Sequence, residues 1–206
     1  MALSNSSGNT IYLSVFGGKI TRKVKDANTP GAVERTNKKG NIVHEVLYDN
    51  LSGTLTGIEF REGDYGKEIH FIVKDKDDTY RLQLPYSSAV AKSFVMRLPN
   101  AKLSDVMEFH TGWDKDKQKQ FSYIKQDGAT VKSKYTKDEP NGMPPMEKKK
   151  LKGQEVWDDS DQLDFLDEML KKDVLPQLRK SGETIIPDQE DLPITEVHEE
   201  IDPLPF

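Results

Sequence analysis

The chain has 206 residues, of which 34% are hydrophobic, with 30 Lys and Arg against 35 Asp and Glu and no cysteine. This length allows one domain with a sizeable core plus appendages, and the low hydrophobic fraction predicts that part of the chain does not pack. The absence of cysteine excludes disulfide scaffolds, thiol catalysis and Cys-ligated zinc.

The charge is distributed unevenly along the chain. Residues 183–206 hold eight acidic side chains and no Lys or Arg, which leaves 30 basic and 27 acidic side chains in residues 1–182, a net charge of +3. The overall charge of −5 therefore combines a mildly basic body with an acidic tail.

The first 84 residues are rich in segments typical of β-strands. Some are β-branched and aromatic runs bounded by Gly, Asn and Asp, and the last two alternate apolar and polar residues around a turn at residues 75–78. The predicted strands cover residues 11–16, 42–48, 54–60, 67–74 and 79–84.

One helix is predicted next, with Ser87 or Ser88 as its cap and Pro99 at its end. Its apolar residues, at helical spacing, are Ala91, Phe94, Val95 and Leu98. The pattern then predicts a short strand, a charged loop, and a hairpin that turns at the tripeptide Gln-Asp-Gly. These segments cover residues 103–110, 112–118, 119–125 and 129–135.

A meander of three strands, one helix and two further strands is the order of an OB-fold, a five-stranded Greek-key barrel. We therefore predict a mainly β, OB-fold domain over residues 1–136, with an extra N-terminal strand within residues 11–25. Another small β-sandwich is the alternative, which the single helix at this position disfavours.

The composition changes after the barrel. Proline and glycine predict a linker over residues 137–153, and an amphipathic helix is expected in residues 154–182, ending near Pro176. Its apolar stripe is expected to pack on the barrel or, alternatively, on a second subunit. Four prolines and eight acids predict a disordered acidic tail over residues 183–206.

Patterns typical of enzymes and metal sites are absent from the sequence. Ile20 follows Gly18-Lys19 where a phosphate-binding loop needs Ser or Thr, and the four histidines lie far apart. We expect neither catalysis nor a metal or other cofactor.

Basic residues interleaved with aromatic ones are the main functional signal, because lysines follow phosphates and aromatic faces stack on bases. Trp113 is expected on the loop between strands four and five of the barrel, and Tyr65 on the loop between strands one and two. Phe121 and Tyr123 are equally compatible with stacking and with the core. The full candidate set for single-stranded DNA is Trp113, Tyr65, Tyr123, Phe121, Tyr135, His70, Lys74, Arg81, Lys19, Arg22, Lys23, Lys115, Lys117, Lys119, Lys125, Lys132 and Lys134.

The chain ends in Asp202, Pro203, Leu204, Pro205 and Phe206 after several further acids. This ending resembles the acidic, phenylalanine-terminated tip of bacterial and phage single-stranded DNA-binding proteins, and a phage-type member is the nearer likeness. The resemblance covers about the last eight residues. It implies that the tip binds replication and recombination enzymes, with the ring and terminal carboxylate in a basic-rimmed apolar pocket of the partner.

Together these features predict a non-enzymatic protein that binds and protects single-stranded DNA, independent of sequence, in replication, recombination or repair. An RNA-binding OB-fold protein, or an interaction adaptor or inhibitor whose tail mimics DNA, is the alternative. No apolar run reaches the ~18 residues of a membrane helix and no signal-peptide pattern occurs, so we expect a cytoplasmic protein, in the bacterial host if phage-encoded, with no membrane contact and possible self-association.

Overall fold

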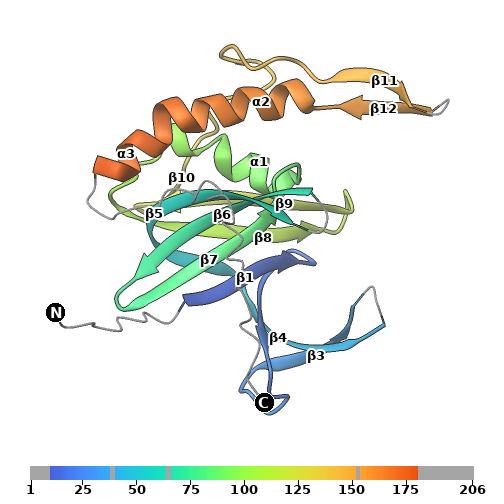
Figure 1. Ribbon diagram of the computed structural model, residues 1–206, viewed down its shortest axis with the longest axis vertical. Helices are drawn as coiled ribbons and strands as arrows, with labels where there is room; N and C mark the ends of the chain where they lie inside the picture. Colours follow the sequence, from blue (N-terminus) through green and yellow to red (C-terminus); the bar gives the residue numbers. More distant parts are fainter. Residues whose placement is uncertain (1–9, 38–39, 64–65, 152–153, 181–206) are drawn as a thin grey trace, which may run out of the picture.

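The computed structural model describes residues 10–37, 40–63, 66–151 and 154–180. Ten strands join one sheet in the order β10-β9-β8-β5-β6-β7-β1-β2-β4-β3 (Figure 1). These strands are β1 (Thr10–Phe16), β2 (Lys19–Val24), β3 (Ala32–Thr36), β4 (Ile42–Tyr48), β5 (Asn50–Gly63), β6 (Gly66–Asp75), β7 (Asp78–Pro85), β8 (Val106–Asp114), β9 (Lys119–Gln126) and β10 (Ala129–Thr130). The predicted mainly β fold is confirmed, with ten strands in the sheet instead of five.

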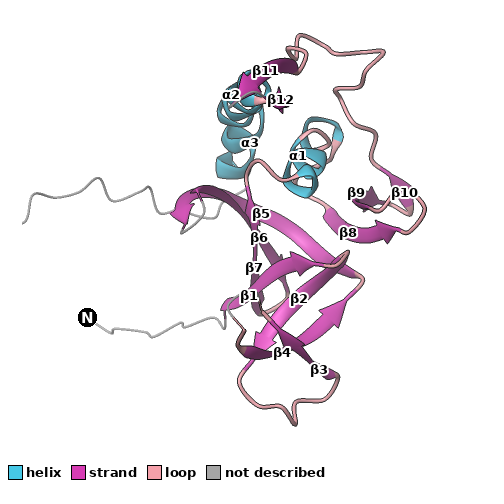
Figure 2. Cartoon of the chain, turned by 90° about the vertical axis from the view of Figure 1, so that its right-hand side faces the viewer, coloured by secondary structure: helices cyan, strands magenta, loops and turns pink. Residues whose placement is uncertain are grey.

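The sheet curls back on itself because β4 runs into β5 with only Asp49 between them. β4 pairs with β2, whereas β5 pairs with β6 and β8, so the strands from β5 through β6, β7, β1 and β2 return to the start of β5 (Figure 2). The long, curved β5 pairs with β8 over residues 50–54 and with β6 over residues 54–63, and the β6 pairing has a register shift between Leu55 and Gly57 that bends the strand. Side chains from the strands that make this circuit face one another in its interior.

The N-terminal strand β1 lies parallel to β7 and forms a hairpin with β2. The hairpin turn lies against β8, where the Thr111 hydroxyl donates a hydrogen bond to the Gly18 carbonyl at 3.0 Å. Gly18 has a φ of +79°, and a Cβ there would lie 2.6 Å from the carbonyl carbon of Gly112. Only glycine permits this backbone approach.

The core contains a cluster of three phenylalanines. Phe71 on β6, Phe109 on β8 and Phe94 on the helix are fully buried, and Phe94 meets each of the other two edge to face at centroid distances of 5.9 and 5.2 Å. Phe94 belongs to α1 (Ala89–Val95), which begins at Ser88, whose side chain accepts the Ala91 amide hydrogen bond. A 3-10 turn (Leu98–Asn100) with Pro99 follows, so the predicted helix is present between β7 and β8.

The C-terminal helical segment consists of α2 (Ser160–Met169), a π-helical stretch (Leu170–Val174) and α3 (Leu175–Lys180). The helix was expected to end near Pro176, but the structure continues it through this residue with a π-helical stretch immediately before it. A proline removes one backbone donor and its ring crowds the preceding turn, and a wider turn accommodates both effects. Leu166, Leu170 and Val174 are buried in the core of the same chain, so the stripe packs against the sheet.

Several segments differ from the predictions. Part of the expected linker is a strand, β11 (Glu147–Leu151), which pairs with β12 (Gln154–Asp158) in a separate two-stranded sheet. β12 also occupies the start of the segment expected to be helical. β8 continues to Asp114 through part of the expected charged loop, and only Ala129 and Thr130 of the expected return strand pair with β9.

Candidate nucleic-acid interface

The outer face of β9 carries a stripe of aromatic and basic side chains. Lys119, Phe121, Tyr123 and Lys125 alternate with the inward residues Ser122 and Ile124, which are buried. Phe121 is 45% exposed and Tyr123 is half-buried. Strand periodicity places these four side chains on one face, as predicted, and the burial of their neighbours identifies that face as the outer one.

The neighbouring strand β8 packs against the aromatic rings of this face and fixes their orientation. His110 on β8 is the register partner of Tyr123, and the two rings lie 4.9 Å apart with planes 4° from parallel. Tyr123 in turn lies 6.2 Å from Phe121 with an interplanar angle of 11°. We call Phe121, Tyr123 and His110 the aromatic stripe.

Gly112 provides the space for the end of the stripe. It is the register partner of Phe121, and a Cβ at this position would lie 2.1 Å from Cζ of the Phe121 ring. The ring therefore reaches across β8 into the volume that any other residue would fill. Cross-strand pairs between an aromatic residue and glycine fix the ring against the sheet.

The lysines at the two ends of the stripe are available to an anion. Lys119 and Lys125 lie opposite Asp114 and Glu108, respectively, but each acid has another partner. Asp114 is 3.6 Å from the Lys117 amine and accepts backbone hydrogen bonds from the turn, contacts that lower its pKa, and Glu108 is 2.7 Å from Nε2 of His110. Within the described part of the chain, neither Lys119 nor Lys125 makes an ion pair.

The outer face of β6 and β7, also expected to bind DNA, is arranged differently. Arg81 donates to both carboxylate oxygens of Glu59, at 2.5 and 3.2 Å, and these bonds lower the pKa of Glu59. His70 is buried, with 2% of its surface exposed, and its Nε2 lies 3.0 Å from Glu68. The prediction that His70 and Arg81 line an open face is corrected: Glu59 on β5 binds Arg81, and Glu68, on the same strand as the buried His70, contacts that ring.

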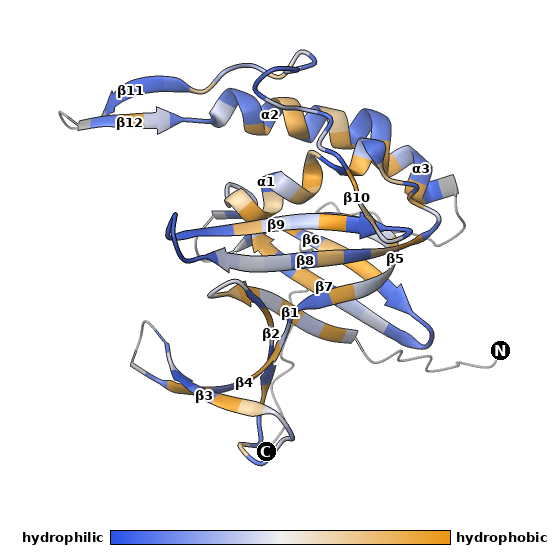
Figure 3. Ribbon diagram, turned by 180° about the vertical axis from the view of Figure 1, so that it is seen from behind, coloured by the Kyte–Doolittle hydropathy of each residue, from blue (hydrophilic) through white to orange (hydrophobic). Residues whose placement is uncertain are grey.

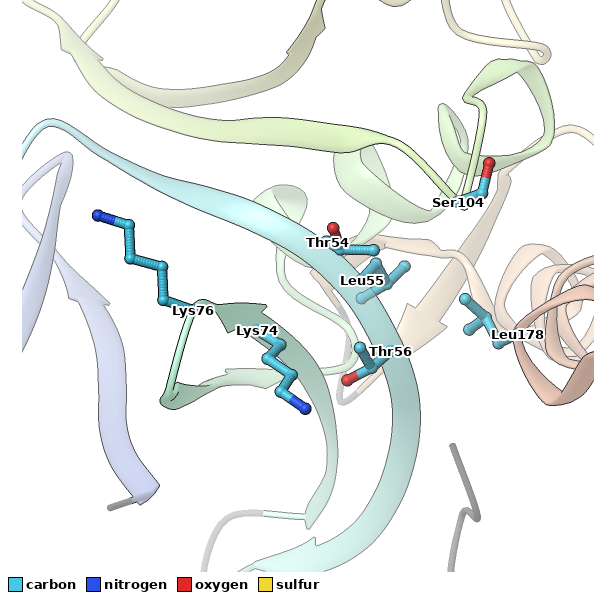
Figure 4. A pocket seen from close by; sticks show the side chains of 7 residues that line it. All are labelled: Thr54, Leu55, Thr56, Lys74, Lys76, Ser104 and Leu178. Atoms are coloured by element: carbon cyan, nitrogen blue, oxygen red, sulfur yellow. The ribbon is translucent and has the colours of Figure 1, made fainter. Parts of the chain in front are cut away.

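Lys74 remains exposed at the end of β6 and lines a pocket of about 470 Å³ beside the bend in β5. Figure 4 places Lys74 and Lys76 with their amines extended in different directions, while Ser104 and Leu178 approach the pocket from elsewhere in the chain. The two lysine amines therefore do not converge on one position in the pocket where a phosphate could bind.

Two aromatic residues of the candidate set lie elsewhere than expected. Trp113 is within β8 and not on a loop, is 45% exposed, and faces away from the aromatic stripe, because its register partner is Gln120. Tyr135 is buried, with 4% exposed, and packs edge to face on Phe165 of α2. The burial of Tyr135 raises the pKa of its hydroxyl and removes its ring from any base.

The remaining basic residues of the set are spread over the molecule. Lys115 and Lys117 lie in the turn between β8 and β9, at the hydrophilic end of that hairpin in Figure 3. Lys132 and Lys134 follow β10, and the amine of Lys134 lies 3.9 Å from Asp173 on the helical side. On β2, Lys19 pairs with Asp49, Lys23 is exposed, and Arg22 lines a second pocket.

Some predicted residues cannot be placed. Tyr65 and the five residues of the terminal tip, Asp202, Pro203, Leu204, Pro205 and Phe206, lie outside the described residues. Two residues that the sequence prediction missed belong to the candidate interface: His110, which stacks on Tyr123, and Gly112. The alternation of residues 108–114 could have placed both on one face, but the register with β9 could not be read from the sequence.

Comparison with protein-family models, curated proteins and solved structures found no match for this chain. Among the described residues, no three His, Asp, Glu or Cys side chains are grouped so that they could hold a metal ion. No helix in the described ranges has the length and apolar content needed to cross a membrane.

Proposed function

We propose that the protein binds single-stranded DNA, independent of sequence, on the outer face of β8 and β9. The observation that carries this proposal is the partly exposed aromatic stripe with, at each end, a lysine that makes no ion pair among the described residues. Aromatic faces stack on any base, each stack contributing roughly 1–3 kcal/mol, and lysines follow the phosphates. The outer face of β9 would thus contact both the bases and the phosphates of the DNA strand.

The order of the strands supports an OB-fold as the scaffold. β5, β6 and β7 form a meander, α1 follows, and β8 returns to pair with β5 before β9, which gives the spatial order β9-β8-β5-β6-β7. This order is the one expected for the Greek-key arrangement of a five-stranded, partly open barrel. β1 occupies the position beside β7 and extends the barrel, as β2, β3 and β4 do.

The acidic tail has a separate role in this proposal. Its terminal Phe206 and the acids before it would recruit replication or recombination enzymes, while its eight acids compete with phosphates for a body of net charge +3. The proposed function thus uses two parts of the chain: the face that stacks on bases and the C-terminal tip that recruits enzymes. Neither part requires catalysis or a cofactor.

The test is fluorescence anisotropy of labelled oligo-dT titrated with the full chain and with a chain ending at Gly182, at two salt concentrations. We expect affinity to fall with salt, with a slope near −0.7 per phosphate contacted, and to rise when the tail is removed. Deletion of Phe206 alone should abolish partner binding and retain DNA binding.

Matched RNA and DNA oligomers in the same assay separate the alternatives, because stacking does not depend on the sugar. Equal or tighter binding of RNA would favour an RNA-binding protein. No binding of either polymer by either chain would contradict the proposal and favour an adaptor.

A further inference from the structure

A small pocket of about 220 Å³ opens where the curled sheet closes on itself. It lies between the β1–β2 hairpin, the junction of β4 and β5, and the turn that joins β6 to β7. Its apolar floor includes the buried Leu13, Ile20 and Leu51, and polar side chains surround its opening. A concave, mainly apolar lining with a few polar groups that orient the ligand is typical of small-molecule sites.

Arg22 is the feature of this pocket that the fold does not explain. Its Nε is buried from solvent and has no hydrogen-bond partner, and within the described residues Arg22 makes no ion pair. Asp75 lines the same pocket but is not bonded to Arg22. An unpartnered Nε–H costs folding free energy, and because no carboxylate in the described part of the chain binds the Arg22 guanidinium group, its other N–H donors can bind an acceptor on a ligand in the pocket.

The other side chains that line the pocket indicate which class of ligand it would bind. Tyr48 and Tyr80 offer aromatic surface, and the pKa of Tyr80 is raised by burial and by Asp78, whose side chain is hydrogen-bonded to the Tyr80 hydroxyl. Asn50 can donate and accept, whereas the Asp75 carboxylate only accepts when ionised. A phosphate would be repelled by Asp75, but a nucleobase presents flat apolar faces together with donors and acceptors on its edge.

The pocket adjoins the aromatic stripe. Asn50 is the register partner of His110, which is the register partner of Tyr123. The three residues therefore share one face across three neighbouring strands, which are spaced about 4.8 Å apart. A single polymer lying across these strands could pass from Tyr123 to the mouth of the pocket.

We propose that this pocket takes one unpaired nucleobase, held by Arg22 and Asp75 at its edge and by Tyr48 and Tyr80 at its faces. The proposal rests on the proposed function, since it assigns a base-binding pocket to the strand that follows the stripe. It adds a pocket that binds one base beside a surface that stacks on bases without distinguishing them.

Replacement of single nucleotides in oligo-dT by abasic ones tests the pocket with the full chain. We expect one abasic position to weaken wild-type binding by about 5-fold or more, the loss of one stacked base. Arg22→Gln should weaken binding of the intact oligomer and lose the sensitivity to that position. Lys23→Gln is the matched control, because it removes the adjacent cation from the opposite face of β2 and should keep the wild-type abasic profile.

Tyr48→Ala provides a second variant that removes a partly exposed side chain, and thermal unfolding of each variant confirms that it is folded. If Arg22→Gln and Tyr48→Ala both keep the wild-type abasic profile, the pocket does not hold a base. Such a result would leave the proposed function intact.

A nucleoside titration tests the pocket independently of strand binding. Thymidine should shift the Arg22 Nε–H resonance in the NMR spectrum of the full chain, and inorganic phosphate should not. A shift with phosphate alone would identify an anion site and overturn the proposal, as would no shift with thymidine. Failure of oligo-dT binding together with a thymidine shift would contradict the proposed function and not the pocket.

Discussion

The two outer faces considered for DNA binding both carry basic side chains beside carboxylates, but the contacts between these groups differ. On β6 and β7, Arg81 is bound by Glu59 and His70 is buried beside Glu68. On β8 and β9, the acids are engaged by Lys117 and His110, and the lysines at the ends of the stripe have no ion pair in the described chain. Whether a basic residue is available depends on whether the nearby carboxylates already have another partner, and the residue type alone does not decide it.

Aromatic residues distinguish the two faces in the same way. Phe121 and Tyr123 lie over Gly112 and His110, which leave their rings ordered and partly exposed. The β6–β7 face has no comparable set of stacked rings among its described residues. We therefore expect substitutions on the first face to change affinity and those on the second to change stability.

The largest effect is expected from the double substitution Phe121→Ala and Tyr123→Ala. Each ring that stacks on a base contributes roughly 1–3 kcal/mol, so oligo-dT affinity should fall by at least about 30-fold in anisotropy measurements. Tyr12→Ala is the control, because Tyr12 is an exposed ring on β1, the register partner of Arg81 on the other face. An equal loss from both variants would remove the distinction between the faces.

Glu59→Gln tests the second face through stability. Replacing a carboxylate that accepts two guanidinium bonds should destabilise the fold by about 1.5–3 kcal/mol at neutral pH, with unchanged DNA affinity. The Arg81 contact lowers the Glu59 pKa from its ordinary value of 4.5, so this contribution is complete above that pH and disappears as pH falls through the folded-state pKa. Denaturant unfolding of both proteins against pH measures it, and a difference that persists at low pH would contradict this assignment.

Gly112→Ala should weaken DNA binding by about 1 kcal/mol, at the low end of a single stacking contribution, because the new methyl group displaces the Phe121 ring. Phe121 is partly exposed and can move, so the unfolding temperature should change little. In a double-mutant cycle, Gly112→Ala should have no further effect once Phe121 is alanine. Independent, additive losses would contradict a role through the ring.

The smallest effects belong to single lysines. Lys119→Ala or Lys125→Ala should reduce the slope of log affinity against log salt by about 0.7 each, the value for one phosphate contact on a single strand. Lys172→Ala, whose amine pairs with Glu168 on the helical side, should leave the slope unchanged. Salt titrations of the three variants compare them directly, and a slope change in Lys172→Ala alone would exclude the stripe as the phosphate path.

Much of the fold was predictable because it depends on local patterns. Alternation located β6, β7 and β9, and the capped apolar spacing located α1 between β7 and β8. The β11–β12 hairpin was missed because its strands carry charged residues and little alternation. The continuation of the helix past Pro176 was missed because a π-helical stretch accommodates the proline.

The candidate site was predictable only in part. The shared face of Lys119, Phe121, Tyr123 and Lys125 follows from period two, but whether that face points inward depends on how the whole sheet packs. The burial of Tyr135 depends on contact with α2, 30 residues away in sequence at Phe165. Such long-range contacts leave no local signal.

The most direct test of the central claim is an NMR map of amide shifts in the full chain as oligo-dT is added. We predict that the shifts concentrate on residues 108–113 and 119–126, with smaller changes on residues 68–74 and 79–83. Shifts concentrated on the second pair of segments would place the DNA on β6 and β7 and contradict the account.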